Sequence, residues 1–115
     1  MLPDDVKRLI PLTPAVFYVL LSLSSGPKHG YAIMQETNTL SEDNFQMGPA
    51  TLYSTIQRLV ALQLIDEIAD DQAEASRRRY YELTKMGRLL LESDVSRMST
   101  VARMAARLLQ KRSEA

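Results

Sequence analysis

The pattern of apolar and polar positions in the first half of the chain predicts three helices. Thr13 is a suitable N-cap and Pro14 suits a first helical position, so the first helix should run through the nearly all-apolar residues 15–25. The second helix should open at His29 and fade between residues 38 and 43, where turn-forming residues gather. The first helix, apolar almost all round, is expected to be buried in the core.

The third helix, expected from Gly48 to about Leu62, has one apolar and one polar face. The apolar positions repeat with a period of about 3.6 and are Leu52, Ile56, Leu59 and Val60. The side chains expected on the opposite face are Thr51, Ser54, Thr55 and Arg58. The segment contains no Asp or Glu, whereas ordinary surface helices are usually rich in Glu and Lys. Short, hydrogen-bonding or basic side chains suit a DNA major groove about 12 Å wide, so the pattern favours a recognition helix.

A β-hairpin is expected after the third helix. Its segments are a strand at 64–69, a polar turn at 70–76 and a returning strand that reaches residue 83. In the returning strand Arg79, Tyr81 and Leu83 should face one side, and Tyr80 and Glu82 the other. The basic run at 77–79 should contact DNA phosphates, although alternate side chains cannot all reach one groove. The tip carries Asp70, Asp71 and Glu74 and should point away from the phosphate backbone.

A long final helix is predicted from a cap at Thr84 to about Arg112. Its apolar positions, spaced 4-3-4-3-4 like a coiled-coil seam, are Leu91, Val95, Met98, Ala102, Ala105 and Leu109. A helix of about 27 residues is about 40 Å long, more than one small domain can cover, so packing within the chain accounts for only part of the seam. The remainder should pair with a second copy. Such a homodimer would present two recognition helices about 34 Å apart to a pseudo-palindromic operator.

Three helices followed by a hairpin and a long helix predict a mainly α fold, a winged helix-turn-helix with a C-terminal dimerisation helix. We expect a DNA-binding domain at residues 9–84 and the dimerisation helix at residues 85–112. A chain of 115 residues fits one compact domain, for which a partner subunit would add core.

Charge is distributed unevenly although the net charge is zero. Residues 1–76 hold four bases and ten acids, a net −6, whereas residues 77–112 hold ten bases and three acids, a net +7. This asymmetry suggests contact with a polyanion, while a solvated basic helix face would account for most of the later arginines. An acidic N-terminus and the lack of a long apolar run predict a cytoplasmic protein without a membrane span.

The residue types needed for catalysis are scarce, so we do not expect an enzyme. The chain has no Cys and a single His, His29, which at a helix start suits capping or packing better than chemistry. The sequence therefore predicts neither a cofactor nor a metal. The alternative to a DNA reader is a winged-helix protein-interaction module that does not read DNA, which the zero net charge and the acidic hairpin tip favour slightly.

Several segments in this order resemble the PadR family of transcriptional regulators. They are Leu12 to Leu23, the His29-Gly30-Tyr31-Ala32-Ile33 motif, Gly48-Pro49-Ala50-Thr51-Leu52-Tyr53, Leu59 through Leu64-Ile65, and Arg78 to Gly87. The resemblance spans about residues 9 to 110 and implies a homodimeric winged-helix repressor, whose relatives often respond to phenolic or other aromatic small molecules. It also implies that Thr51, Tyr53 and Ser54 lie at the DNA and that Arg77, Arg78 and Arg79 lie in the wing. Position 54 is often Pro in relatives and is Ser here.

The candidate site residues follow from both lines of argument. The expected DNA contacts are Thr51, Tyr53, Ser54, Arg58, Arg77, Arg78 and Arg79. An aromatic effector would most simply bind where the first and last helices meet at the dimer axis, with Phe17 and Met98 as contacts, although methionine at helical spacing is more often plain core. The chain lacks Trp, so stacking of a flat ligand on indole does not apply.

Overall fold

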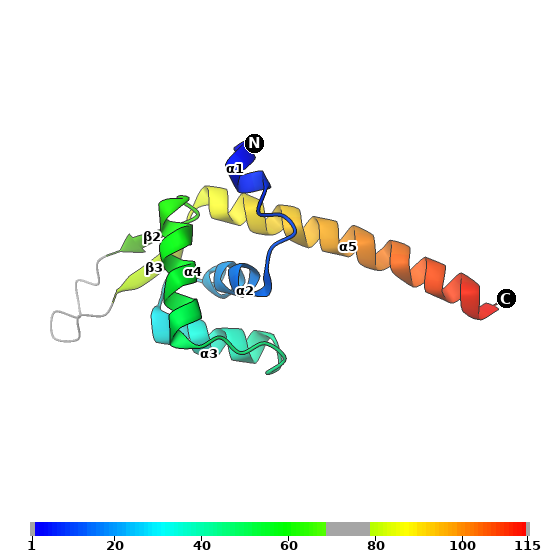
Figure 1. The fold of residues 1–115 in the computed structure, drawn as a ribbon, viewed down its shortest axis with the longest axis horizontal. Helices are drawn as coiled ribbons and strands as arrows, with labels where there is room; N and C mark the ends of the chain where they lie inside the picture. The colour runs from blue at the N-terminus through cyan, green and yellow to red at the C-terminus, as the bar shows by residue number, and fades with distance from the viewer. Residues whose placement is uncertain (1, 69–78, 115) are drawn as a thin grey trace.

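Five helices and three short strands make up the part of the chain that the computed structural model describes, residues 2–68 and 79–114, with side chains as far as Lys111. The helices are α1 (Asp4–Lys7), α2 (Pro14–Leu23), α3 (Gly30–Leu40), α4 (Pro49–Ala61) and α5 (Lys85–Glu114). The strands are β1 (Lys28–His29), β2 (Ile65–Ile68) and β3 (Tyr80–Leu83). The β2–β3 hairpin lies beside α4 at one end of the molecule, and α5 extends to the opposite end (Figure 1). The predicted mainly helical, winged helix fold is confirmed.

The helix starts lie where local capping chemistry predicts them. The Thr13 Oγ1 atom accepts a hydrogen bond from the Val16 N–H at 3.3 Å, and the His29 Nδ1 atom accepts one from the Ala32 N–H at 3.3 Å. Each bond satisfies one of the first backbone donors of a helix, which have no partner inside the helix. The prediction that His29 caps a helix is therefore confirmed. The one-turn helix α1 was not predicted.

The core forms around α2, which packs against α3, α4 and α5. Val19 and Leu20 of α2 are fully buried, as are Leu52 and Leu59 of α4. The predicted apolar stripe of α4 therefore faces α2, and Val60 at its edge is partly buried. This packing leaves the other side of α4 open to solvent.

One side chain predicted on the outward face of α4 is buried instead. Thr55 is only 9% exposed, so its assignment to the outward face was wrong. The reason is helical geometry: Thr55 follows Leu52 by three residues and precedes Leu59 by four, so it shares their side of the helix. The open face of α4 is therefore narrower than the pattern suggested.

The sheet contains a third strand that the sequence pattern did not predict. Its order is β1-β3-β2, and both pairs are antiparallel. Lys28 of β1 and Glu67 of β2 both pair with Tyr81, so β3 is the central strand. The two-residue strand β1 is too short to show an alternation of apolar and polar residues. It ties the start of α3 to the hairpin.

A tight junction joins the end of α4 to the start of α5. Gln63 adopts a left-handed φ of 62°, and the Leu64 N–H donates to the Leu59 carbonyl oxygen at 2.9 Å, as in a Schellman cap. The Thr84 hydroxyl lies 2.8 Å from the Gln63 carbonyl oxygen and accepts a hydrogen bond from the Gly87 N–H at 3.0 Å. Thr84 therefore caps α5, as predicted, and also fixes α5 against the residues that follow α4.

Replacement of Gly87 by Ala is expected to destabilise the fold. A Cβ atom at this position would collide with the Leu64 carbonyl oxygen and lie 2.9 Å from Leu83 Cδ1, and a backbone oxygen cannot move aside cheaply. We expect Gly87→Ala to lower the free energy of unfolding by roughly 2 kcal/mol or more, despite the better helix propensity of Ala. Denaturant unfolding at one fixed protein concentration measures this change.

Gly48→Ala is the control, because the space around Gly48 is open. Its cost should stay below about 1 kcal/mol, the loss from a poorer N-cap. Equal losses of unfolding free energy in Gly87→Ala and Gly48→Ala would contradict the close packing at Gly87.

Candidate nucleic-acid interface

The open face of α4 carries short polar side chains and one base. Thr51, Ser54 and Arg58 are all exposed, as predicted for residues that contact DNA. The Ser54 hydroxyl donates to the Thr51 carbonyl oxygen at 3.1 Å, which leaves its oxygen lone pairs free to accept a hydrogen bond. Gln57 is also exposed on this helix, and the sequence analysis missed it. An exposed amide on a helix without acids can form paired hydrogen bonds with an adenine edge.

The N-terminus of α4 is open to solvent. Gly48 is the N-cap and makes no side-chain capping bond, and Pro49 occupies the first turn. The first turn contains no acid, so no carboxylate neutralises the positive end of the helix dipole. Free backbone N–H groups in this arrangement are suited to an anion such as a phosphate.

Tyr53 is half exposed and packs against the start of α3. A Cβ atom at Gly30 would lie 2.8 Å from the Tyr53 hydroxyl oxygen, so this ring occupies the space that the missing side chain leaves. Tyr53 is 49% exposed, and its outer part remains accessible. The residue therefore holds α3 against α4 as well as facing solvent.

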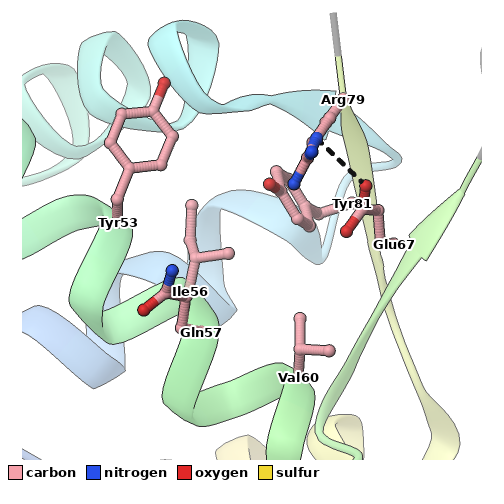
Figure 2. Close-up of a pocket in the computed structure, with 7 residues that line it drawn as sticks. All are labelled: Tyr53, Ile56, Gln57, Val60, Glu67, Arg79 and Tyr81. Carbon is pink, nitrogen blue, oxygen red and sulfur yellow. Dashed lines mark ion pairs between the residues drawn. The ribbon is translucent and has the colours of Figure 1, made fainter.

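A cleft of about 380 Å³ lies between α4 and the β2–β3 hairpin (Figure 2). We call it the helix–hairpin cleft; the residues that line it are Tyr53, Ile56, Gln57, Val60, Glu67, Arg79 and Tyr81. Ile56, Val60 and the Tyr81 ring give it apolar walls, while Glu67 and Arg79 give it a charged edge. Arg79 Nε lies 3.4 Å from Glu67 Oε1. Arg79 thus shares the Tyr81 side of β3, as the predicted alternation requires.

Tyr81 is one of two buried residues of this cleft, with 5% of its surface exposed against 2% for Ile56. Burial raises the pKa of its hydroxyl above the ordinary value of 10, because the charged phenolate would lose hydration. The nearby Glu67 carboxylate raises this pKa further, while Arg79 lowers it.

The remaining predicted DNA contacts, Arg77 and Arg78, lie outside the described residues, as does the acidic hairpin tip. Like Gln57, Glu67 lines the helix–hairpin cleft and was not singled out by the sequence analysis. Its place in the alternation of β2, two residues after the buried Ile65, was the signal that could have assigned it to the side facing α4.

The predicted seam of α5 divides into two parts. Leu91 is 5% exposed and packs within the chain's own core, together with the fully buried Leu90. From residue 99 to residue 111 every residue of α5 is exposed. The large apolar side chains exposed on α5 from residue 95 onward are Val95 at 44%, Val101 at 44%, Met104 at 47%, Leu108 at 62% and Leu109 at 72%. Val101, Met104 and Leu108 broaden the predicted seam.

The two predicted effector contacts lie on α2 and α5, which pack against each other. Phe17 is partly buried, and its ring contacts the Tyr18 ring edge-on with 5.3 Å between centroids. Met98 is partly buried on α5. Their role in binding a ligand stays a prediction.

Within residues 2–68 and 79–111, no three side chains of His, Asp or Glu gather as a metal site would require. None of the described helices has the length and apolar character to cross a membrane.

A winged helix with a solvent-open, acid-free helix beside a hairpin is the arrangement of a class of DNA-binding proteins. Residues 19–93 match the model of the transcriptional regulator PadR-like family, and the chain belongs to this family of DNA-binding transcriptional regulators. The predicted family is confirmed.

The chain is similar in sequence to two uncharacterised proteins. The chain is 32% identical over 74 residues to protein X of Lysinibacillus sphaericus, covering 64% of this chain and 68% of that protein. It is 36% identical over 96 residues to a 37.1 kDa transposon protein of Streptomyces fradiae. That match covers 84% of this chain but only 25% of the longer relative, so the chain corresponds to a quarter of it.

Solved structures share the fold at lower sequence identity. A PadR family transcription regulator from Clostridium difficile has a TM-score of 0.71 and 21% identity, with 84% of this chain and 99% of that chain covered. A transcriptional regulator from Clostridium thermocellum has a TM-score of 0.70 and 21% identity, with coverage of 93% and 97%.

Because burial raises the pKa of Tyr81, we expect the hydroxyl of this tyrosine to ionise only above the ordinary tyrosine pKa of 10. The raised pKa stabilises the fold below pH 10, and this contribution is lost as the pH rises above 10. Tyrosinate absorbance during an alkaline titration measures the effect. Tyr81→Phe should remove a hydroxyl that ionises above pH 10 and leave the rest of the titration curve unchanged. Loss of a group that ionises at or below pH 10 in this variant would contradict the burial argument.

Proposed function

We propose that the chain is a homodimeric, sequence-specific transcriptional repressor that inserts α4 into the DNA major groove. The observation that carries this proposal is the exposed, acid-free face of α4 beside the hairpin stem. Thr51 and Ser54 would read base edges, because short hydroxyl side chains can reach them when the helix lies deep in the groove. Arg58 near the C-terminal end of α4 would contact base edges or phosphate.

The wing would contribute contacts to phosphate. We assign this role to Arg77, Arg78 and Arg79, which would hold the hairpin stem against the DNA backbone. Such contacts contribute affinity for every sequence and make binding dependent on salt. Base preference would then rest with α4, and overall affinity would rest with α4 and the wing together.

Substitutions in α4 and in the wing should have different effects on DNA binding. We expect Thr51→Ala and Ser54→Ala to change the preference among sequences, because each removes a hydroxyl contact to a base edge worth about 0.5–1.5 kcal/mol. Replacement of Arg77, Arg78 and Arg79 by Ala should weaken binding to all duplexes and flatten the dependence of affinity on salt. Selection of bound duplexes from a random pool identifies the operator, and fluorescence anisotropy at several salt concentrations measures the affinities.

Arg8→Ala provides the control for loss of one positive charge, because Arg8 is exposed at the end of α1, outside α4 and the hairpin. It should leave operator affinity nearly unchanged. If the variants in α4 and the wing bind every duplex as the wild type does, the chain does not read DNA through this face, and a protein-interaction module becomes the better function.

Dimerisation would bury the exposed apolar side of α5. Val95, Met98 and Leu109 lie on this side at heptad spacing, with the small side chains of Ala102 and Ala105 between them. Large apolar side chains rarely form so long an exposed row on a monomer, since their burial contributes about 25 cal/mol per Å². Pairing of two α5 helices would place the two copies of α4 on successive turns of the operator.

A charge on the apolar side of α5 should prevent dimerisation. Leu109→Lys would place an ammonium group among apolar partner residues, and we expect the dimer to dissociate at least about tenfold more readily. Analytical ultracentrifugation over a range of concentrations measures this change. Thr100→Lys adds the same charge on the polar side of α5 and should leave the dimer intact. A wild-type chain that stays monomeric at high concentration would contradict the proposal.

An aromatic small molecule would release this repressor from DNA. Its binding site would form where α2 meets α5, with Phe17 and Met98 as contacts, and binding there would alter the spacing between the two recognition helices. The close packing of α2 against α5 supports this assignment, because a shift of one helix would be passed to the other.

A further inference from the structure

An ion pair links the wing stem to the neighbouring strand beside α4. Arg79 Nε on the β3 side lies 3.4 Å from Glu67 Oε1 on β2, and both side chains are turned toward the helix–hairpin cleft (Figure 2). The Arg79 side chain is 73% exposed and that of Glu67 is 44% exposed. Exposed pairs of this kind contribute little to folding stability. The stability of the fold therefore does not explain why an acid occupies position 67.

Glu67 stands out because of where its charge lies. Among the residues that line the helix–hairpin cleft it is the one acid, and the helix across the cleft carries none. A DNA sugar-phosphate backbone that runs between α4 and the wing would pass the charged edge of the helix–hairpin cleft. A carboxylate and a phosphate oxygen offer similar acceptors to a guanidinium group, so Glu67 can occupy Arg79 donors that a phosphate would use.

We infer that Glu67 sets the DNA affinity of this protein by competing with the phosphate backbone for Arg79, an inference that rests on the proposed function. Arg79 must leave Glu67 to bind a phosphate, and the freed carboxylate then repels the same strand. Both effects lower affinity. Because phosphate contacts are common to all sequences, the loss applies equally to the operator and to other duplexes.

The test compares Glu67→Gln with Glu82→Gln. Both substitutions remove one negative charge from the hairpin and keep the side-chain size. Glu82 lies on the other side of β3, beside Ser24 and Arg88, and lines a different pocket. Fluorescence anisotropy with the selected operator and an unrelated duplex, at two salt concentrations, measures the affinities. Thermal unfolding verifies that both variants are folded.

We expect Glu67→Gln to bind both duplexes about three- to fivefold more tightly than the wild type, the range that a weak exposed ion pair allows. Glu82→Gln should change affinity by less than about twofold, because its charge faces away from the cleft. In an Arg79→Ala background the gain from Glu67→Gln should shrink, since the competition needs both partners.

Three results would overturn the inference. Equal gains for Glu67→Gln and Glu82→Gln would indicate a general effect of net charge, and an undiminished gain in the Arg79→Ala background would exclude competition for Arg79. Weaker binding by Glu67→Gln would mean that Glu67 orients Arg79 toward the phosphate. Failure of the wild type to bind any duplex would instead remove the proposed function itself.

Discussion

The contact between Gly87 and the Leu64 carbonyl group is the constraint on which the arrangement of this molecule depends. It holds the first turn of α5 against Leu64, which lies between α4 and β2. A side chain larger than glycine at position 87 would push α5 away from Leu64. The Thr84 hydroxyl strengthens the same junction by contacting the Gln63 carbonyl oxygen at 2.8 Å. The direction of the long helix is thereby fixed relative to α4. Any spacing between two copies of α4 in a dimer is set through this junction.

Which positive charges of this protein are available to a ligand depends on local ion pairs and hydrogen bonds more than on the net charge of each half of the chain. The second half of the chain is basic, yet several of its arginines are occupied within the fold. Arg97 Nε lies 2.8 Å from the carboxylate of the buried Asp94, and Arg88 donates to the Ser24 carbonyl oxygen at 3.3 Å. Arg79 pairs with Glu67. The absence of acids on α4 is therefore a better guide to a polyanion-binding face than the net charge of +7 on residues 77–112.

The long helix α5 has two parts that differ in burial. Its first three turns are anchored, because Leu90, Leu91 and Asp94 are buried against the winged domain. Beyond residue 98 the helix projects into solvent and gives the molecule its longest dimension of 65 Å. The projecting part keeps an apolar side that is exposed to solvent, with Leu109 72% exposed. In the proposed dimer this side would pair with a second copy, and the anchored part would hold the two DNA-binding units at a fixed separation.

The sequence by itself determined helices α2 to α5 and their N-terminal caps but not the one-turn helix α1, since a cap at Thr13 or Thr84 and an apolar period of about 3.6 are set by neighbours within a few residues. The order of the elements then gave the winged fold, and the resemblance of several sequence segments gave the family. Only the tertiary structure decided which residues share the helix–hairpin cleft and how β1 joins the sheet. It also decided the turn after α4, where Gln63 adopts the left-handed conformation at a position that glycine usually occupies. These features depend on contacts between segments far apart in the chain, which a local sequence pattern does not reveal.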